Sequence, residues 1–464
     1  MPLHVAPFIA VIIAVIGGGT GIDRAIAMPQ DVVLNQDVVL NQDVAKPKSN
    51  PAKFVPNYAE DRVPDYTLAD PLMTADGEKI RNADQWPERR NEILDQFRDH
   101  VYGHSPEPCE VESKTLFEGE HASGRIREVE VRLRSGGRYL PIHVLIFTPE
   151  TERDVPTFLL LNFQGNHTVC DHPDVAITEA WVRNRRDGST DGNRALSVAR
   201  GRAASRFPIE PIIAAGFGVA TAYYGEIRPD TDKLPADDGS KTIAQHLPGL
   251  LSPPGDVPER SRWGAIAQWA YGLDRIAEAI GDGVDGIDGD RMIVAGHSRL
   301  GKTSLWAGAT SPRFAGVVSN DSGCGGAALS IRAFGETVGR INDAFPHWFC
   351  DRFKDYNLRE EHLPVDQHLL IASIAPRPVY VASADGDRWA DPRGEFLSLV
   401  AAAPAFGLGA NAAPTGTLTA DQFPEPGGVV RHGPLGYHLR SGRHDLTPFD
   451  WRQYTSFFAD ALDD

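Results

Sequence analysis

The chain has little cysteine and little methionine, with four of each among its 464 residues. The cysteines form no C-x-x-C pair, so a zinc site is not expected. Their pairing cannot be deduced from the sequence, and most of them are expected to be buried thiols. They stand at positions Cys109, Cys170, Cys324 and Cys350.

The chain also lacks a long apolar run and an excess of positive charge. No segment after the N-terminus approaches 18 uninterrupted apolar residues, which argues against a membrane span in the mature chain. The formal net charge is −17, whereas a general nucleic-acid binder needs a basic face. We therefore expect a soluble protein with no nucleic-acid partner.

The first 60 residues do not resemble a folded domain. Residues 7–16 are apolar and Ala25-Ile26-Ala27 offers a small-x-small cleavage site, so residues 1–27 resemble a secretory signal peptide, although no Lys or Arg precedes the apolar stretch. Residues 28–60 carry a tandem DVVLNQ repeat and then AKPKSNPAK, which predicts a linker. The competing interpretation of VIGGGTGIDRAIA as a dinucleotide-binding turn loses support because no βαβ unit follows. A secreted or periplasmic protein is expected.

Residues 61–464 are predicted to form one α/β catalytic domain with loop insertions. Strands are expected at 125–134, 140–149, 155–163, 217–224, 291–296, 315–320 and 377–384, and helices at 83–102, 263–280, 303–309, 395–403 and 449–462. The first three strands have hairpin-like spacing. The later alternation predicts a mostly parallel central sheet with helices on both faces, a three-layer α/β/α sandwich. Insertions at 164–207 and 226–262 are expected to build loops over the site.

The loop GHSRLGKT, residues 296–303, allows two interpretations. It matches the P-loop G-x-x-x-x-G-K-[ST], and it also places Ser298 two residues after a glycine, as a hydrolase nucleophile elbow does. The P-loop is weakened because an exported protein meets little ATP and because a phosphate nest prefers small residues to His-Ser-Arg-Leu. The elbow departs from G-x-S-x-G, since its second glycine comes one position late.

The order of residues along the chain favours the elbow. Hydrolases of the α/β type run nucleophile, acid, histidine. Here Ser298, Asp321 and Asp387 each follow a predicted strand, and His444 stands just before the last helix. A serine needs a base to take its proton, and the base needs a carboxylate to hold its tautomer. The ends of the strands of an α/β sheet are where such residues meet.

Several segments together resemble the glucuronoyl esterases, carbohydrate esterase family 15. They are GHSRLGK, NDSGCGG (320–326), FGETVGRINDAFPHWF (334–349), PRPVYVASADGDRWADPRGEF (376–396) and GYHLRSGRHDLTPFDW (436–451). They occur in the family's order, and the resemblance covers about residues 60–464. It implies an α/β-hydrolase fold, no metal or other cofactor, and cleavage of the ester between 4-O-methyl-glucuronic acid on xylan and alcohols of lignin.

The resemblance also implies roles for single residues. Ser298 is the expected nucleophile, His444 the general base, and Arg299 the oxyanion-hole donor. A cation aimed at the tetrahedral oxyanion stabilises the transition state more than the ground state. The positions that match the family's sugar pocket are Lys302, Glu336 and Trp389.

Two aspartates compete for the role of the acid. Family members place the acid after one of two strands, and Asp321 occupies the first place, where Glu is usual, while Asp387 occupies the second. The shorter Asp321 side chain must reach about one methylene further. We expect Asp387 to orient His444 and Asp321 to support it.

A second departure from the family is His297, which stands where the signature has Cys. In many fungal relatives that cysteine forms a disulfide beside the catalytic histidine. Asp445, which follows His444, is not Cys either, so both halves of the bridge are absent together. We expect packing or polar contacts to hold the site, and the His297 side chain to point away from Ser298.

The leading hypothesis is a monomeric, exported serine esterase that acts on glucuronate esters of plant glucuronoxylan. Another carbohydrate esterase activity, such as that of an acetyl-xylan esterase, stays open. So does a carbohydrate-binding protein with a decayed site, although the complete set of serine, histidine and acid argues against decay.

Overall fold

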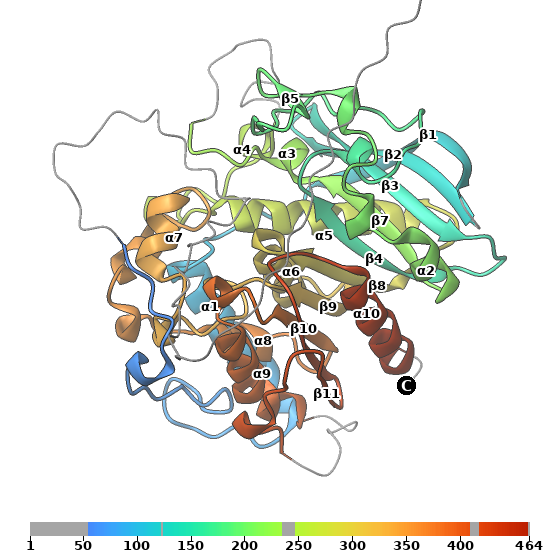
Figure 1. Cartoon of the computed structure of the whole chain (residues 1–464). Helices are drawn as coiled ribbons and strands as arrows, with labels where there is room; N and C mark the ends of the chain where they lie inside the picture. Colours follow the sequence, from blue (N-terminus) through green and yellow to red (C-terminus); the bar gives the residue numbers. More distant parts are fainter. Residues whose placement is uncertain (1–53, 122–123, 234–245, 409–416, 463–464) are drawn as a thin grey trace, which may run out of the picture. The chain divides into compact units, whose positions relative to one another are not determined.

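Ten strands form one sheet in the computed structural model of the chain, which describes residues 54–121, 124–233, 246–408 and 417–462 (Figure 1). The strands are β1 (Glu110–His121), β2 (Gly124–Ser135), β3 (Arg138–Pro149), β4 (Val155–Asn162), β7 (Gly218–Tyr223), β8 (Ile287–His297), β9 (Phe314–Asn320), β10 (Val379–Ala384), β11 (Val429–His432) and β12 (Leu435–Arg440). Their order is β1-β2-β3-β7-β4-β8-β9-β10-β12-β11. The predicted signal peptide and most of the predicted linker lie outside the described residues.

The centre of the sheet is parallel. The run of strands β7, β4, β8, β9, β10 and β12 is joined only by parallel pairings. Antiparallel pairing adds β3, β2 and β1 on one side and β11 on the other. The predicted mostly parallel central sheet is thus confirmed.

Helices cover both faces of this sheet (Figure 1). One apolar core lies under α1 (Trp86–His100), α5 (Ala265–Gly283), α6 (Arg299–Thr310), α8 (Gln367–Ala372) and α9 (Pro392–Phe406). A second core, on the other face, lies under α2 (Ile209–Ala214) and α10 (Pro448–Ala461). Along β8 the side chains alternate between the two cores, with Val294 in the first and Ile293 in the second. The three-layer α/β/α prediction is confirmed.

The prediction of consecutive hairpins was wrong for the strands around residue 150. β3 and β4 follow each other in the chain, but β7 lies between them, antiparallel to β3 and parallel to β4. The physical reason is that β4 is apolar and almost wholly buried, which suits a strand with parallel neighbours and covered faces. A short loop before such a strand does not ensure that it pairs with its predecessor.

The sequence analysis missed three strands of the ten-stranded sheet, and also the two-residue strands β5 (Thr190–Asp191) and β6 (Arg194–Ala195), which form a separate two-stranded sheet. β1 is rich in charge and has no buried residue, because it lies at one edge of the sheet, and β11 at the opposite edge has only four residues. β12 has the sequence LGYHLR and is buried along its whole length. The strand was not predicted because it contains a histidine and an arginine, which have buried hydrogen-bond partners in the structure.

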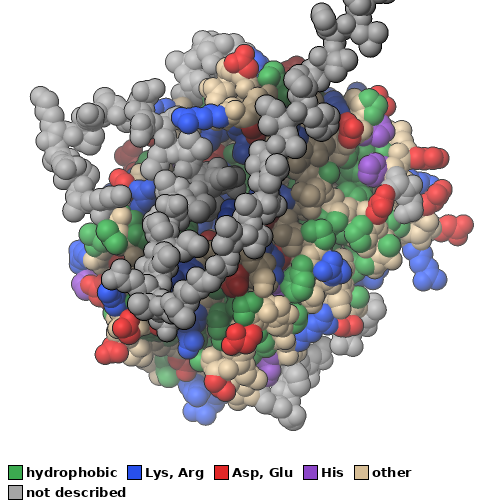
Figure 2. Space-filling view, in the orientation of Figure 1, with side chains coloured by type: hydrophobic (Ala, Val, Ile, Leu, Met, Phe, Trp, Pro, Cys, Tyr) green, Lys and Arg blue, Asp and Glu red, His purple; other side chains and the backbone are tan. Residues whose placement is uncertain are grey.

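The remaining short helices are α3 (Tyr224–Ile227), α4 (Leu247–Leu250) and α7 (Val338–Ala344). Within the described ranges, no helix has the length and hydropathy that crossing a bilayer requires. On the face that Figure 2 shows, acidic and basic side chains are interspersed among hydrophobic ones.

Candidate active site

A sharp turn joins β8 to α6 and carries Ser298. β8 ends at His297, α6 begins at Arg299, and Ser298 between them has φ 59° and ψ −129°. This conformation is unfavourable for a residue with a side chain and is typical of strained functional turns. Backbone hydrogen bonds maintain it, because Ser298 N donates to Asn320 O at 2.9 Å and Gly301 N donates to Ser298 O at 2.9 Å.

The two glycines of the turn explain its unusual spacing. A Cβ on Gly296 would overlap the carbonyl group of Leu300. A Cβ on Gly301 would lie 3.0 Å from the Ser322 side chain and 3.2 Å from Asn320 O. The close approach of α6 to the end of β9 therefore leaves little room for a side chain at position 301, whereas the Leu300 side chain is buried in the core.

His444 lies on the loop between β12 and α10, opposite Asp387 from the end of β10. The distance from His444 Nδ1 to Asp387 Oδ2 is 2.6 Å, and both side chains are largely buried. A carboxylate only accepts hydrogen bonds, so Nδ1 carries the proton and Nε2 has the basic lone pair. The His297 ring lies 4.4 Å from the His444 ring, centroid to centroid, which brings His444 beside the turn of Ser298.

Asp321 has a different partner. Its Oδ2 accepts from Arg440 Nη2 at 3.0 Å, and its Oδ1 accepts from Ala384 N at 2.7 Å. Burial raises the pKa of Asp321, the Asp387 carboxylate adds to the rise, and Arg440 opposes it. Of the two competing acids, Asp387 contacts the imidazole and Asp321 contacts a buried guanidinium.

The ligand atoms of Asp321, Asp387 and His444 lie within 4.8 Å of one another, as in a metal site. Their contacts place the imidazole of His444 against a carboxylate that can orient it. The His444 ring nitrogen nearest the acids already meets Asp387, and Arg440 already supplies a positive charge to Asp321. The set can hold a serine, a base and an orienting carboxylate in sequence.

Below the histidine lies a buried polar network that the sequence analysis missed. Arg440 Nε donates to Asp450 Oδ1 at 3.1 Å, and His438 Nε2 lies 2.8 Å from the same oxygen. Asp450 Oδ2 also accepts from Thr447 N at 2.7 Å, in the capping box that starts α10. That T-x-x-D pattern was visible in the sequence, but its link to the catalytic loop depends on β12, which was not predicted.

The His297 side chain contacts Asn320. Its Nδ1 lies 2.6 Å from Asn320 Oδ1. Burial, and then the neighbouring His444, lower the pKa of His297 well below its usual range, so this ring adds no positive charge next to the base. Asp445, where the fungal bridge would end, accepts from Arg206 Nε at 2.7 Å. The Arg206–Asp445 contact thus lies at one end of the position where many fungal relatives have a disulfide.

Arg299 lies between two aromatic rings at the start of α6. Its guanidinium carbon is 5.3 Å from the ring centroids of both Phe163 and Trp348. Its Nη1 donates to the buried Asp230 at 2.8 Å. Asp230 was not singled out in the sequence, because it lies in a predicted insertion and belongs to no motif.

The three predicted sugar-pocket residues come together beside α6. Lys302 is buried and its Nζ donates to Ser322 O. Burial lowers the pKa of Lys302 and raises that of Glu336, and each group opposes the shift of the other. Glu336 N donates to Trp389 O at 3.0 Å, which joins the two loops that carry these residues.

Residues 54–60, which the sequence analysis assigned to the linker, pack on the same loops. The Phe54 ring meets the Trp389 ring edge-on at 6.0 Å, and Asn57 O accepts from Gly335 N at 2.9 Å. Glu60 pairs with Arg332 at 2.8 Å. The packed part therefore begins before residue 61, because an aromatic, a backbone carbonyl and a carboxylate in this stretch each find a partner.

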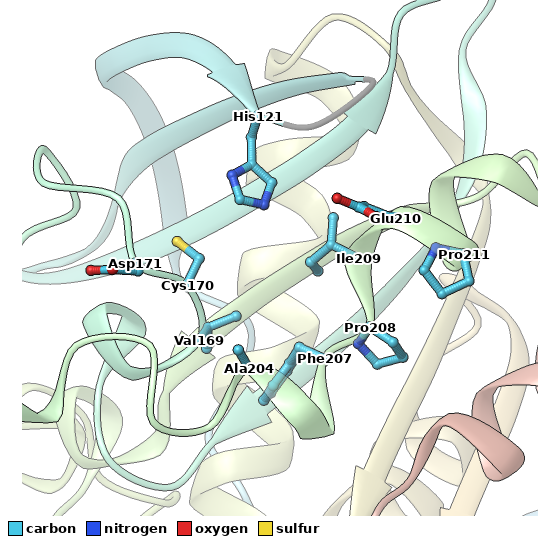
Figure 3. Close-up of a pocket in the computed structure, with 10 residues that line it drawn as sticks. All are labelled: His121, Val169, Cys170, Asp171, Ala204, Phe207, Pro208, Ile209, Glu210 and Pro211. Atoms are coloured by element: carbon cyan, nitrogen blue, oxygen red, sulfur yellow. The ribbon is translucent and has the colours of Figure 1, made fainter.

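Two surface pockets contain none of the predicted site residues. One, of about 250 Å³, lies next to α2, where His121, Cys170 and Glu210 line it (Figure 3). The other, of about 240 Å³, is lined by Glu128, Glu226 and neighbouring residues. Neither pocket includes the serine turn.

The chain is similar to known carbohydrate esterases. A family model described as "Glucuronyl esterase, fungi" matches residues 258–408. Carbohydrate esterase MZ0003, from an unknown prokaryotic organism, is 44% identical over 409 residues, which cover 86% of this chain and 91% of that protein. A 4-O-methyl-glucuronoyl methylesterase from Podospora anserina is 36% identical over 135 residues, 27% of this chain and 28% of that one.

Solved structures extend the likeness to the fold. A promiscuous CE15 esterase from a marine bacterial metagenome is 42% identical with a TM-score of 0.78, covering 87% of this chain and 99% of that one. A glucuronoyl esterase from Solibacter usitatus is 36% identical with a TM-score of 0.76, covering 87% and 100%. The chain is therefore an α/β-hydrolase and carboxylic ester hydrolase that belongs to carbohydrate esterase family 15, the glucuronoyl esterases.

Proposed function

We propose that this chain is a serine esterase that hydrolyses the ester between (4-O-methyl-)glucuronic acid of glucuronoxylan and lignin-type alcohols, through an acyl-enzyme on Ser298. The observation that carries the proposal is the 2.6 Å contact between His444 and Asp387 beside a serine in a strained turn. Relatives named 4-O-methyl-glucuronoyl methylesterases support the acyl group.

The reaction has two halves. In the first, His444 Nε2 takes the Ser298 proton while the serine oxygen attacks the ester carbonyl carbon, and Arg299 stabilises the oxyanion. The intermediate collapses, the C–O bond to the alcohol breaks, and His444 protonates the departing alcohol. In the second, His444 deprotonates a water that attacks the acyl-enzyme, which releases glucuronic acid and returns the proton to Ser298.

The two aspartates have separate roles in this scheme. Asp387 orients His444 and stabilises its imidazolium form through the Nδ1 contact. Asp321 supports the loop of the histidine through Arg440 and the Asp445 backbone amide. The direct contact favours Asp387 as the main acid.

Lys302, Glu336 and Trp389 would bind the sugar. An ammonium donates to hydroxyl oxygens and a carboxylate accepts from hydroxyl hydrogens, while an indole offers an apolar face to a pyranose ring. Lys302 is buried and Glu336 is partly buried, and each favours the charged form of the other.

The test is hydrolysis of benzyl glucuronate beside benzyl galacturonate and 4-nitrophenyl acetate, with Ser298→Ala as the blank. Fast release from the glucuronate ester that depends on Ser298 is the expected result. No release from any ester would contradict the proposal and favour a carbohydrate-binding protein.

A broader esterase is the second candidate, because a similar solved structure is described as a promiscuous CE15 esterase. Its signature is a comparable, Ser298-dependent rate on all three esters. Release of acetate alone would indicate another carbohydrate esterase, such as one acting on acetyl-xylan.

We propose further that residues 1–27 direct export and that the mature enzyme works outside the cytoplasm, as a monomer. The apolar stretch and the Ala25-Ile26-Ala27 site support export. Cell fractionation with N-terminal sequencing of the recovered protein tests it. An enzyme found in the cytoplasm with its first residues intact would contradict it.

A further inference from the structure

Asp230 gathers hydrogen-bond donors from three other segments of the chain. Its carboxylate is fully buried. Oδ2 accepts from Arg299 Nη1 at 2.8 Å, and Oδ1 accepts from His347 Nε2 at 2.8 Å and from Trp348 Nε1 at 2.7 Å. Arg183, from the insertion at 164–207, donates to the Asp230 backbone carbonyl at 2.9 Å. A buried carboxylate with this many donors is held in one orientation.

Asp230 is a fixed negative charge. Burial by itself would raise its pKa, but Arg299, His347 and Arg183 outweigh burial, and the pKa of Asp230 is lowered. Burial lowers the pKa of His347, although its bond to Asp230 opposes this. The arginines that pair with the Asp230 carboxylate are Arg299, at 2.8 Å, and Arg183, at the longer distance of 3.4 Å.

The same cluster determines where the Arg299 side chain lies. Asp230 holds Nη1, and the rings of Phe163 and Trp348 lie against the guanidinium at 5.3 Å. Trp348 contacts both residues, because its ring lies against the Arg299 guanidinium and its indole N–H donates to Asp230. An unrestrained arginine loses rotamer entropy when it becomes fixed, and an oxyanion donor is effective only when it is already in place.

We infer that Asp230 is a positioning residue that holds the Arg299 guanidinium ready for the oxyanion. The inference rests on the proposed role of Arg299. It gives a catalytic purpose to the insertions at 164–207 and 226–262, since the first contributes Arg183 and the second contributes Asp230 itself.

A double-mutant cycle tests the inference, because a residue that acts through Arg299 has nothing to act on once Arg299 is removed. Asp230→Asn should lower kcat on benzyl glucuronate by about 10- to 100-fold, with KM changed by less than about 3-fold. In an Arg299→Ala background the same substitution should change kcat by less than about 3-fold.

The matched control is Asp274→Asn. Asp274 pairs with the buried Arg275 and also accepts from Ser311, just beyond the end of α6 opposite Ser298. The substitution Asp274→Asn removes an acidic partner of an arginine outside the site. It should therefore change kcat by less than about 2-fold in the wild-type background and in the Arg299→Ala background.

An equal loss in both backgrounds would overturn the inference, since it would mean that Asp230 supports the fold and not Arg299. If Asp230→Asn does not fold, Asp230→Glu keeps the charge, moves it by one methylene, and enters the same cycle. The rate at which a phosphonate reagent labels Ser298 serves as a second readout, because its phosphoryl oxygen occupies the oxyanion position. The enzyme could hydrolyse none of the esters while Asp230→Asn slows the labelling of Ser298 only when Arg299 is present. That outcome would reject the proposed substrate but support the role of Asp230.

Discussion

At the scale of single residues, three buried acids near Ser298 have different partners. Asp387 faces the imidazole of His444, and Asp321 faces the guanidinium of Arg440. Among the described residues, Glu395 accepts from hydroxyls and backbone amides, including Ser383 Oγ at 2.6 Å and Ser322 N at 2.8 Å. The three carboxylates should therefore respond differently to the same change.

Asp387→Asn should lower kcat by about 10³- to 10⁴-fold with little change in the melting temperature, because the amide no longer holds the His444 tautomer. Asp321→Asn should lower the melting temperature more than it lowers kcat. It removes one of the two acidic partners of the buried Arg440, Asp321 and Asp450, which costs up to about 3–5 kcal/mol of stability. Steady-state kinetics and thermal unfolding of both variants test this pair.

A near-normal turnover in Asp387→Asn together with lost turnover in a folded Asp321→Asn would reverse the assignment of the acid. The wild-type enzyme and Ser298→Ala give the upper and lower limits of activity for this comparison.

At the scale of elements, the turn between β8 and α6 depends on contacts that tolerate no Cβ at Gly296. Gly296→Ala should lower the free energy of unfolding by about 2–3 kcal/mol or more, because the new methyl group meets backbone and not a flexible side chain. Denaturant unfolding measures this.

Gly255→Ala is the matched control, since nothing lies within 4 Å of the Cβ it would add. It should change the free energy of unfolding by less than about 1 kcal/mol. Equal stability of both variants would show that α6 can move away from β8.

A second prediction at this scale concerns residues 54–60, which pack against the loop that carries Trp389. Phe54 packs against Trp389, whereas the neighbouring Val55 is 80% exposed. Phe54→Ala should raise KM for benzyl glucuronate by about 3- to 10-fold, because Trp389 loses its support, and Val55→Ala should leave KM unchanged. A change in kcat alone would argue against a role in substrate binding.

At the scale of the whole molecule, buried acids make the stability depend on pH. Burial raises the pKa of Glu395 from 4.5 to about 7. A raised folded-state pKa gives stability that is complete below the unfolded value and is lost as pH rises through the folded value. The window is therefore pH 4.5 to 7, and the contribution is at most about 3 kcal/mol.

Glu395→Gln should thus gain up to about 3 kcal/mol relative to wild type between pH 5 and pH 8. The measurement is the free energy of unfolding of both proteins across this range. Comparing the two proteins cancels the other titrating groups. The exposed Glu152→Gln serves as control, and its difference from wild type should not change with pH.

Much of the fold was predictable because its signals are local. The apolar run of β8 and the strict alternation in β2 come from neighbours in the chain, and both were found. β12 was not, because His438 and Arg440 look unsuited to a buried strand until Asp450 is brought beside them. The position of β7 between β3 and β4 was also missed, since strand pairing is a contact between distant segments.

The site divides in the same way. The sequence by itself determined the family and predicted the candidate residues Ser298, Asp321, Asp387 and His444 with their order, because motif spacing and chain order need no coordinates. Only the tertiary structure decided that Asp387 meets His444, that Asp321 meets Arg440, and that Asp230 lies under Arg299. The physical reason is that a carboxylate's partner is set by which strand ends and loops converge in a buried, low-dielectric place, and those segments are far apart in the sequence.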